Sequence, residues 1–342
     1  MQYVTRRIKV REIGSEFWDV PCIDQRNSIF PESTQWFLSG RSALKAVIRE
    51  LGGAGSVSMP SWCCDSMIKP FAEAGFEVRF YPVYFRDGQL IQEWSYDSDV
   101  LFLMDYFGYT GPSPDLSGFK GTVIRDVTHS VFASEPCDAE FYFGSLRKWC
   151  GVWTGGYAWA KDGRRLQPLL KDDAGYAALR RQAMLQKAEY ISGIRGDKGY
   201  LQIFIETEEL LENADALPAA DRDVEMAEKL DTETIRSRRR ANADVLRSTF
   251  ADWTMFPKRS PNDVPMFVPV LVPDGKRNEL RRYLIQREIY CPVHWPLSEY
   301  HRLHARECFI YDNELSLVCD QRYTEDDMDR MAETIKAFWK GV

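Results

Sequence analysis

Short apolar segments alternate with amphipathic ones along the first half of the chain. An amphipathic helix is expected over residues 42–51, where a glycine pair follows it, and a second over 65–74. The expected strands are short and rich in β-branched and aromatic residues; they cover 56–59, 77–83, 99–105, 122–126, 140–144 and 156–160. Strands interleaved with helices or loops are typical of a mostly parallel sheet that is buried on both faces.

The pattern changes after residue 175. Residues 175–250 are charged and have a helical period, and a strand pattern returns at 266–272 before a further helix near 277–287. The last helix is expected from Thr324, where Asp327 stands three residues further on as a weak capping box. The chain therefore combines an α/β part with a smaller part of different character.

Length and composition support two domains. A chain of 342 residues with 44% hydrophobic residues has ample material for a core. We expect a large α/β domain over residues 1–250, in which 1–34 form an N-terminal extension. A small C-terminal α+β domain is expected over 251–342.

Charge and cysteine usage bound the class of protein. The net charge of −7 argues against broad binding to nucleic acid or to anionic membranes. The longest apolar stretch, 264–272, contains two prolines and is too short to span a bilayer. The N-terminus lacks the apolar block of a secretory signal, and the eight cysteines have no CxxC spacing, as expected for reduced thiols in a cytoplasmic protein.

Two features place candidate chemistry at the ends of expected elements. SGRSAL (39–44) is a glycine turn that opens into a helix, and the N–H groups of such a helix start can bind a phosphate. A plain turn with a capping residue is the alternative. Asp126 ends an apolar strand, where open α/β sheets bind ligands, and His129 follows three residues later. A solvated loop aspartate is the alternative for Asp126.

A lysine and a glycine pair follow the next strand. Lys148 stands among aromatic residues in FYFGSLRKW, where desolvation would favour the neutral amine that Schiff-base chemistry requires. A solvated surface lysine is the alternative. The pair Gly155-Gly156 leads into another strand and can equally be a turn.

In chain order, these segments resemble one family. SGRSAL, PSWCC, EAGFEVRFYPV, DYFG, RDVTH, the lysine and the glycine pair are similar to segments of the DegT/DnrJ/EryC1/StrS aminotransferases. RRRANADVL, VHWPL and LSLVCDQRYTEDDMDRM are similar to segments of that family's small domain. The resemblance covers roughly 35–160 and 235–335, and order and spacing together make it specific. The family is a branch of the fold type I pyridoxal-phosphate (PLP) enzymes, many of which act on nucleotide-linked keto sugars.

The resemblance implies roles for residues around PLP. Lys148 would bind the cofactor as a Schiff base and later move a proton between substrate and cofactor. Asp126 would pair with the pyridine nitrogen and keep it protonated, and His129 would hold the phenolic oxygen. The phosphate would be bound by Gly40, Arg41 and Ser42, with a further hydroxyl from Ser145.

Further positions are assigned by the same resemblance. Cys64 stands where many relatives carry an aromatic residue that stacks on the cofactor ring, so Trp62 or Tyr106 is expected to supply that face. Tyr106 is also a candidate substrate contact. His294 in VHWPL matches a small-domain segment that usually approaches the active site.

Three departures from the family pattern concern the site. Phe143 replaces a serine, the GEGG ending has become WTGG, and the GxNxR-like motif that reaches the partner subunit's site is not visible. Arg195 and Lys198 are candidates for the cation that this motif would supply, and a solvated loop is the alternative.

The resemblance implies an aminotransferase that moves an amino group from a donor such as glutamate onto a nucleotide-linked keto sugar. PLP would be the cofactor and a homodimer the working unit. Two alternatives stay open: a PLP enzyme acting on another carbonyl or amino-acid substrate, and a low-turnover PLP-fold protein with a regulatory or binding role. Lys148 argues against the family's sugar dehydratases, in which histidine replaces the lysine.

Two other patterns have simpler interpretations. His301, His304 and Cys308 fall at helix-like spacings, but without a CxxC partner we expect no metal site. The basic run 236–240 is expected on a solvated helix face, with one arginine reaching a nucleotide phosphate as the alternative.

Overall fold

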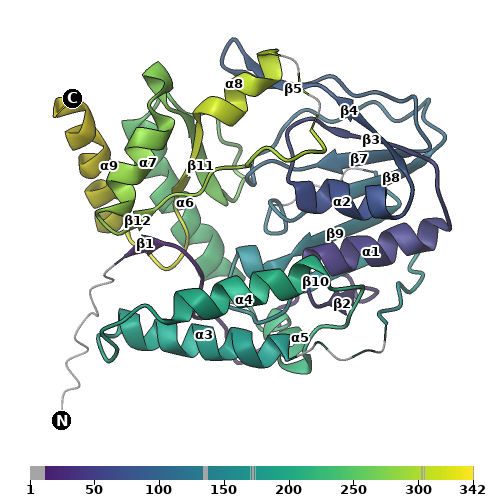
Figure 1. Ribbon diagram of the computed structural model, residues 1–342, viewed down its shortest axis with the longest axis horizontal. Helices are drawn as coiled ribbons and strands as arrows, with labels where there is room; N and C mark the ends of the chain where they lie inside the picture. Colours follow the sequence, from purple (N-terminus) through teal and green to yellow (C-terminus); the bar gives the residue numbers. More distant parts are fainter. Residues whose placement is uncertain are drawn as a thin grey trace.

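The computed structural model describes residues 12–341 except 134–137, 170, 172, 174, 302 and 304. Figure 1 shows a central sheet with helices packed against it and a second group of helices and strands beside it. Among the described residues, no helix is both long enough and apolar enough to cross a membrane.

A mixed sheet of seven strands forms the centre of the large α/β part. In spatial order its strands are β2 (Gln35–Phe37), β10 (Gly156–Ala160), β9 (Phe141–Ser145), β8 (Thr122–Asp126), β7 (Val100–Met104), β3 (Ser56–Pro60) and β4 (Glu77–Tyr81). The five strands from β9 to β4 are mutually parallel, whereas β10 is antiparallel to both β9 and β2. The predicted mostly parallel sheet is therefore confirmed.

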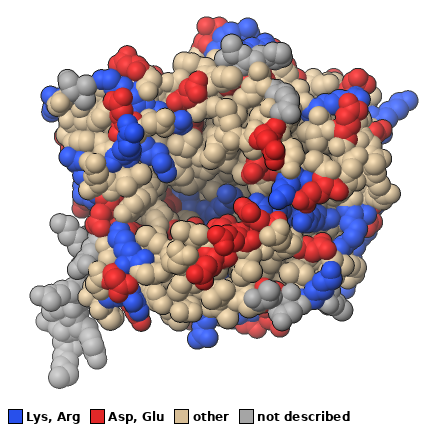
Figure 2. All heavy atoms as spheres, viewed as in Figure 1, with Lys and Arg blue, Asp and Glu red and all other residues tan. Residues whose placement is uncertain are grey.

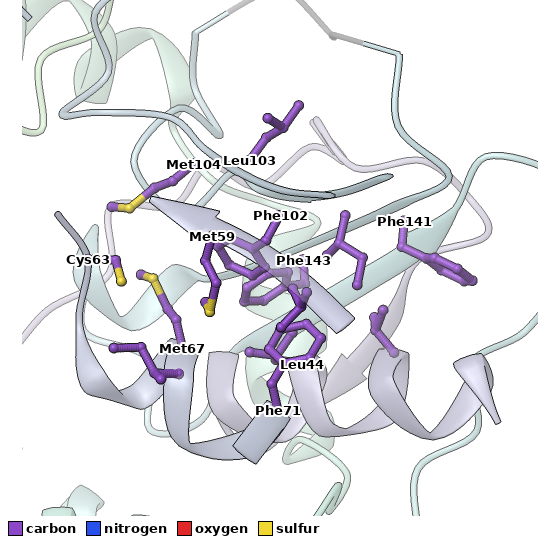
Figure 3. Close-up of a cluster of buried hydrophobic side chains, with 14 of the residues drawn as sticks. Leu44, Met59, Cys63, Met67, Phe71, Phe102, Leu103, Met104, Phe141 and Phe143 are labelled. Atoms are coloured by element: carbon purple, nitrogen blue, oxygen red, sulfur yellow. The ribbon is translucent and has the colours of Figure 1, made fainter. Parts of the chain in front are cut away.

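Helices α1 (Gly40–Leu51) and α2 (Asp65–Glu73) cover one face of this sheet. Figure 3 shows Leu44 of α1 and Phe71 of α2 directed toward Phe102 of β7. Along β7 the next side chain, Leu103, points to the other face of the sheet, as strand alternation requires. This apolar contact fixes α1 and α2 against the strands whose ends carry the candidate site residues.

A second core lies beside the sheet. It is built by α6 (Thr232–Thr249), β11 (Phe267–Leu271), α7 (Arg277–Ile285), β13 (Glu314–Val318) and α9 (Glu325–Lys340). The short strand β1 (Ile13–Gly14) joins this core, because it pairs in parallel with β12 (Ile289–Tyr290). Thr324 caps α9 in a capping box with Asp327, as predicted.

Phe250 and the last turns of α6 also pack into this second core. The division of the chain at residue 250 stays a prediction.

The segment expected to be helical contains four helices. They are α3 (Tyr176–Ile191), α4 (Tyr200–Glu212), α5 (Asp221–Ala227) and α6. Helices α3 and α4 pack against each other as a hairpin, and Figure 1 shows this hairpin at the lower side of the molecule, below the helices of the second core. The structure also contains the 3₁₀ turns η1 (Leu146–Lys148) and η2 (Pro273–Gly275) and the helix α8 (Ala305–Asn313).

The structure differs from the sequence pattern at the expected strand 77–83. Strand β4 ends at Tyr81, and β5 (Val83–Arg86) forms a separate antiparallel hairpin with β6 (Gln89–Gln92). Pro82 between them has no N–H group to donate, so it interrupts the strand. The turn is Asp87-Gly88, and both residues have a positive φ.

Gly156 sets how closely β10 can approach the start of α1. A Cβ atom at this position would overlap the carbonyl oxygen of Ser39, a backbone atom with no room to move. We expect Gly156→Ala to lower the free energy of unfolding by about 1–3 kcal/mol or more, measured by urea denaturation. Gly111→Ala, where a Cβ meets nothing within 4 Å, is the matched control and should change it by about 0.5 kcal/mol or less. Equal effects of the two changes would contradict this account.

Candidate active site

A cleft of about 530 Å³ opens between the ends of the sheet strands and the second core. Figure 2 shows a hollow in this face of the molecule, with Lys and Arg atoms at its floor. The predicted site residues that line the cleft are Gly40, Arg41, Asp126, Ser145, Lys148 and His294. Residues that are distant in sequence, from α1, β8, η1 and the second core, therefore meet here.

The start of α1 forms one wall of the cleft. Ser39 is its N-cap, and the Ser39 hydroxyl accepts a hydrogen bond from the backbone N–H of Ser42 over 3.1 Å. The N–H group of Ser42, which was predicted to bind the phosphate, is therefore already hydrogen-bonded to the Ser39 hydroxyl, and Ser42 is fully buried. The N–H groups of Gly40 and Arg41 have no acceptor within the helix, so they are the free donors. Ser145 lies beside Gly40, because a Cβ on Gly40 would be 3.1 Å from the Cβ of Ser145.

Asp126 places a buried carboxyl group at the C-terminal end of β8. It is 2% exposed, and its Oδ1 accepts a hydrogen bond from the backbone N–H of Thr128 over 2.8 Å. Burial raises the pKa of Asp126 to about 6, against the hydrogen bonds from Thr128, which favour the ionised form. No described cation forms an ion pair with this carboxylate. A buried carboxylate in this state suits a cationic ligand group, such as a protonated pyridine nitrogen.

Lys148 lies in η1, directly after β9. Its side chain is exposed to the cleft, whereas its neighbour Trp149 is fully buried. The expected burial of the lysine among aromatic residues is therefore not observed. The Trp149 ring packs into the core next to the turn, and the Lys148 amine is exposed to solvent. An exposed amine in a cleft is accessible to a carbonyl group.

Two neutral imidazoles lie close together at the back of the site, with ring centroids 5.9 Å apart. The Nδ1 atom of His129 accepts a hydrogen bond from the backbone N–H of Phe107 over 3.1 Å, so the proton of the neutral ring is on Nε2. Burial lowers the pKa of His129 well below its usual value and lowers that of His294 to about 3. The nearby Lys148 lowers both pKa values further. His294 lines the cleft, whereas His129 lies behind its wall.

Neither Cys64 nor Trp62 and Tyr106, of which one was expected to supply the aromatic face at the cofactor ring in its place, lines the cleft. Trp62 and Tyr106 stack on each other, with ring centroids 4.9 Å apart and an interplanar angle of 9°. Tyr106 donates its hydroxyl proton to the Trp62 carbonyl, and the Trp62 indole donates to the carbonyl of His294. Cys64 is the half-buried N-cap of α2 and makes no capping bond with its side chain. Trp62 and Tyr106 instead tie the sheet to the segment that carries His294.

Arg195 and Lys198 bind carboxylates of their own chain. Arg195 pairs with Glu189 and Asp197, while Lys198 donates to Glu12 and to the Tyr290 hydroxyl, each over 2.9 Å. Neither side chain lines the cleft, although Tyr290 does. Their predicted role toward the substrate stays a prediction.

Four cleft arginines were not identified from the sequence: Arg147, Arg239, Arg281 and Arg322. Arg239 comes from the basic run expected on a solvated face, yet it is buried over the Trp149 ring and donates to the Met266 carbonyl over 2.9 Å. Arg322 pairs with Asp320 over 2.8 Å, and Arg147 pairs with Glu208. Arg281 is exposed and forms no ion pair with a described carboxylate. The basic run at 236–240 indicates that arginines are concentrated in this segment, but it does not indicate which of them is buried beside the cleft.

The described residues contain no group of three or more His, Cys, Asp and Glu side chains that could hold a metal ion. Of the residues weighed for such a site, His301 contacts Ser298 and the carbonyl of Cys63 through its ring nitrogens. His304 lies outside the described residues.

The raised pKa of Asp126 predicts a pH-dependent stability. The folded protein releases this proton at about pH 6 rather than at the ordinary value of 3.8, so folding is penalised as the pH rises through this window. Asp126→Asn should therefore stabilise the cofactor-free protein above pH 7, by up to about 3 kcal/mol, and have little effect below pH 4. Urea denaturation at both pH values measures the difference. The exposed Asp252→Asn is the control, and a pH-independent effect of Asp126→Asn would contradict the prediction.

Comparison with known proteins gave matches at the level of structure. No family model matches the sequence, and no curated protein matches it significantly. A sugar aminotransferase from Streptococcus pneumoniae, solved with PMP, is 16% identical, with a TM-score of 0.60 over 89% of this chain and 85% of its own. A DegT DnrJ EryC1 StrS aminotransferase from Brucella abortus is 14% identical, with a TM-score of 0.58 over 89% of this chain and 85% of its own.

PseC from Helicobacter pylori, an aminotransferase of pseudoaminic acid biosynthesis, is 13% identical, with a TM-score of 0.61. This match covers 96% of the present chain and all of PseC. At these identities the similarity concerns the fold, and it extends over nearly the whole chain. The resemblance noted in the sequence is thus confirmed in three dimensions: the chain has the fold type I architecture of the DegT/DnrJ/EryC1/StrS sugar aminotransferases.

Proposed function

We propose that this protein is a PLP-dependent aminotransferase that acts in the cytoplasm on a nucleotide-linked keto sugar, with an amino acid such as glutamate as the donor. One observation carries the proposal: Lys148, Asp126 and the start of α1 line a single cleft in a protein with the sugar aminotransferase fold. An amine, a buried carboxylate and a helix N-terminus are the three groups that PLP chemistry needs around one ligand.

The cleft residues fit PLP in charge and shape. The free N–H groups of Gly40 and Arg41, with the Ser145 hydroxyl, would hold the phosphate at the helix N-terminus. The buried carboxylate of Asp126 would accept a hydrogen bond from the protonated ring nitrogen. His129 does not line the cleft, so its Nε2–H would have to reach the phenolic oxygen from behind the cleft wall. When bound, PLP supplies an electron sink for the bond changes at the substrate carbon.

The residues of the chain supply binding and proton transfer. Lys148 is the cleft amine able to bind a carbonyl covalently, and after its release it can carry a proton to or from the substrate carbon. Asp126 keeps its partner protonated, because a buried carboxylate is stabilised by a cation in contact with it. Because His129 and His294 are neutral, neither imidazole adds a positive charge beside Lys148.

The outer cleft supports an anionic substrate. Arg281 is exposed there without a carboxylate partner among the described residues. Arg41 also lines the cleft and is half-buried, and its Nη1 donates to the Leu211 carbonyl over 3.1 Å. Guanidinium groups bind phosphate and carboxylate oxygens in pairs of hydrogen bonds. A sugar linked to a diphosphate and an amino-acid donor both carry the anionic groups that these cations can bind.

The full-length protein mixed with PLP should develop visible absorption, and glutamate should convert that spectrum to the aminated form of the cofactor. Borohydride reduction before glutamate addition should fix the cofactor on Lys148, as located by peptide mass spectrometry. Lys148→Ala should abolish both the covalent mass and the spectral conversion, a loss of more than about 10³-fold in rate.

Lys161→Ala is the matched control, because Lys161 is an exposed lysine that pairs with Asp138 outside the cleft. Wild-type turnover in Lys148→Ala would overturn the assignment of the lysine. Covalent binding of PLP without conversion by glutamate or other amino donors would instead favour the low-turnover binding protein.

We also propose that the working unit is a homodimer with the outer side of the α3–α4 hairpin at its interface. Leu185, Leu201 and Ile205 are 43–55% exposed there, and Ile194 in the connecting turn is 79% exposed. Apolar side chains gathered on one surface are typical of protein interfaces. Glu208 and Leu211 of α4 line the cleft, so a partner on this hairpin would lie next to the site.

Light scattering should give the mass of a dimer for the wild type and that of a monomer for Leu201→Glu/Ile205→Glu, because two charges would be buried in the interface. Phe309→Glu, at an exposed position of α8, is the control and should stay dimeric. A monomeric wild type at working concentration would refute the dimer, and a dimeric double variant would place the interface elsewhere.

A further inference from the structure

A buried chain of hydrogen bonds connects Glu314 with the cleft. Glu314 and Ser316 are two residues apart on β13, so their side chains lie on the same face of the strand. The Ser316 hydroxyl donates to Oε1 of Glu314 over 2.5 Å. The Oγ atom of Ser316 also lies 2.8 Å from Nδ1 of His294. The backbone N–H of His294 donates to the second carboxylate oxygen over 2.7 Å. Glu314 and Ser316 are fully buried, and His294 is 7% exposed.

Few charges face this chain. Arg277 of α7 approaches Glu314, but it donates to the backbone carbonyl over 3.0 Å and not to the carboxylate. On the side of His294, the facing groups are Lys148 and the neutral His129. Burial raises the pKa of Glu314 to about 8, although Ser316, the His294 N–H and Arg277 favour the ionised form. Both protonation states of Glu314 are therefore accessible near neutral pH.

The two states of Glu314 impose opposite arrangements on the chain. When Glu314 is ionised, it accepts the Ser316 proton, so the Ser316 oxygen must accept a proton from Nδ1 of His294. The Nε2 atom then carries a lone pair. When Oε1 is protonated, it donates to Ser316, whose hydroxyl turns to donate to Nδ1, and the ring proton must reside on Nε2. The change takes up one proton in total, at Glu314, and His294 stays neutral in both states.

The Nε2 atom of His294 is the end of this chain that a ligand can meet. No described residue forms a hydrogen bond with it, and the residue lines the cleft. His129 differs, because the Phe107 backbone fixes its tautomer independently of pH. The imidazole that lines the cleft is thus the one whose hydrogen-bonding role depends on its partners, whereas the fixed donor, His129, lies behind the wall.

We propose that Glu314, acting through Ser316, determines which ring nitrogen of His294 carries the proton, and thereby whether His294 accepts or donates a hydrogen bond in the cleft. Glu314 and Ser316 are positioning residues in this arrangement. In the accepting form, His294 can bind the Lys148 ammonium group or a substrate hydroxyl; in the donating form, it can bind a carbonyl or carboxylate oxygen. The effect on substrates rests on the proposed function, whereas the tautomer itself does not.

Nitrogen-15 NMR of the full-length, ligand-free protein tests this directly, because the ring nitrogen shifts distinguish the two tautomers. The chain contains four histidines, and His294→Gln identifies the signals of His294. We expect protonated Nε2 at about pH 6.5 and protonated Nδ1 at about pH 9.5, with a midpoint near the Glu314 pKa of about 8. A tautomer that stays the same over this range would overturn the proposal.

Two variants separate the parts of the chain. Ser316→Ala should remove the pH dependence of the His294 tautomer, and persistence of the wild-type transition would overturn the role of Ser316. Glu314→Gln keeps the shape, and its amide would donate to Ser316, so Nε2 should stay protonated at every pH; a normal transition in this variant would exclude Glu314. Ser298→Ala is the matched control, since Ser298 bonds Nδ1 of His301, 3.0 Å away, and should leave His294 unchanged. Failure of PLP to bind Lys148 would refute the proposed function without affecting this result.

Discussion

The close approach of α1 to strands β9 and β10 is the constraint on which the cleft depends. Glycine makes it possible: a side chain at Gly156 would overlap the Ser39 carbonyl, and a Cβ on Gly40 would lie only 3.1 Å from the Cβ of Ser145. The helix start is thereby held against the strand that leads to Lys148, and Gly40 and Arg41 line the same cleft as Asp126. The parallel pairing of β8 with β9 places the carboxylate and the amine at the same edge of the sheet.

Much of the sheet and of its helices could be predicted from the sequence, because apolar periodicity reports directly on burial. The β5–β6 hairpin was missed although Asp87-Gly88 is a strong turn signal, since the apolar run across Pro82 was interpreted as one strand. The same reasoning predicted that Asp126 and Lys148 follow two strands that are consecutive along the chain, and in the structure both residues line the cleft. What each side chain contacts was not accessible in this way.

Side-chain partners explain the remaining differences. Trp62 and Tyr106 were expected at the cofactor ring, yet each satisfies its polar group on a neighbouring carbonyl, and the two rings bury each other. Arg239 stands in a run that resembles a solvated face, but it turns inward onto Trp149. Such choices depend on residues more than forty positions away, which local patterns do not encode. The partners of His294 are closer to a local pattern. Glu314 and Ser316 stand two residues apart in the otherwise apolar strand β13, so the sequence itself indicates that both polar side chains lie on one face of the strand.

The pairing of β1 with β12 joins the beginning of the described chain to the second core. From there residues 14–17 run along the cleft as part of its lining before the chain enters the sheet. The N-terminal segment is therefore both a strap between the two cores and a wall of the site. Because β1 is hydrogen-bonded to β12, a movement of the second core relative to the sheet would also displace residues 14–17. The width of the cleft and the position of the N-terminal segment are therefore coupled.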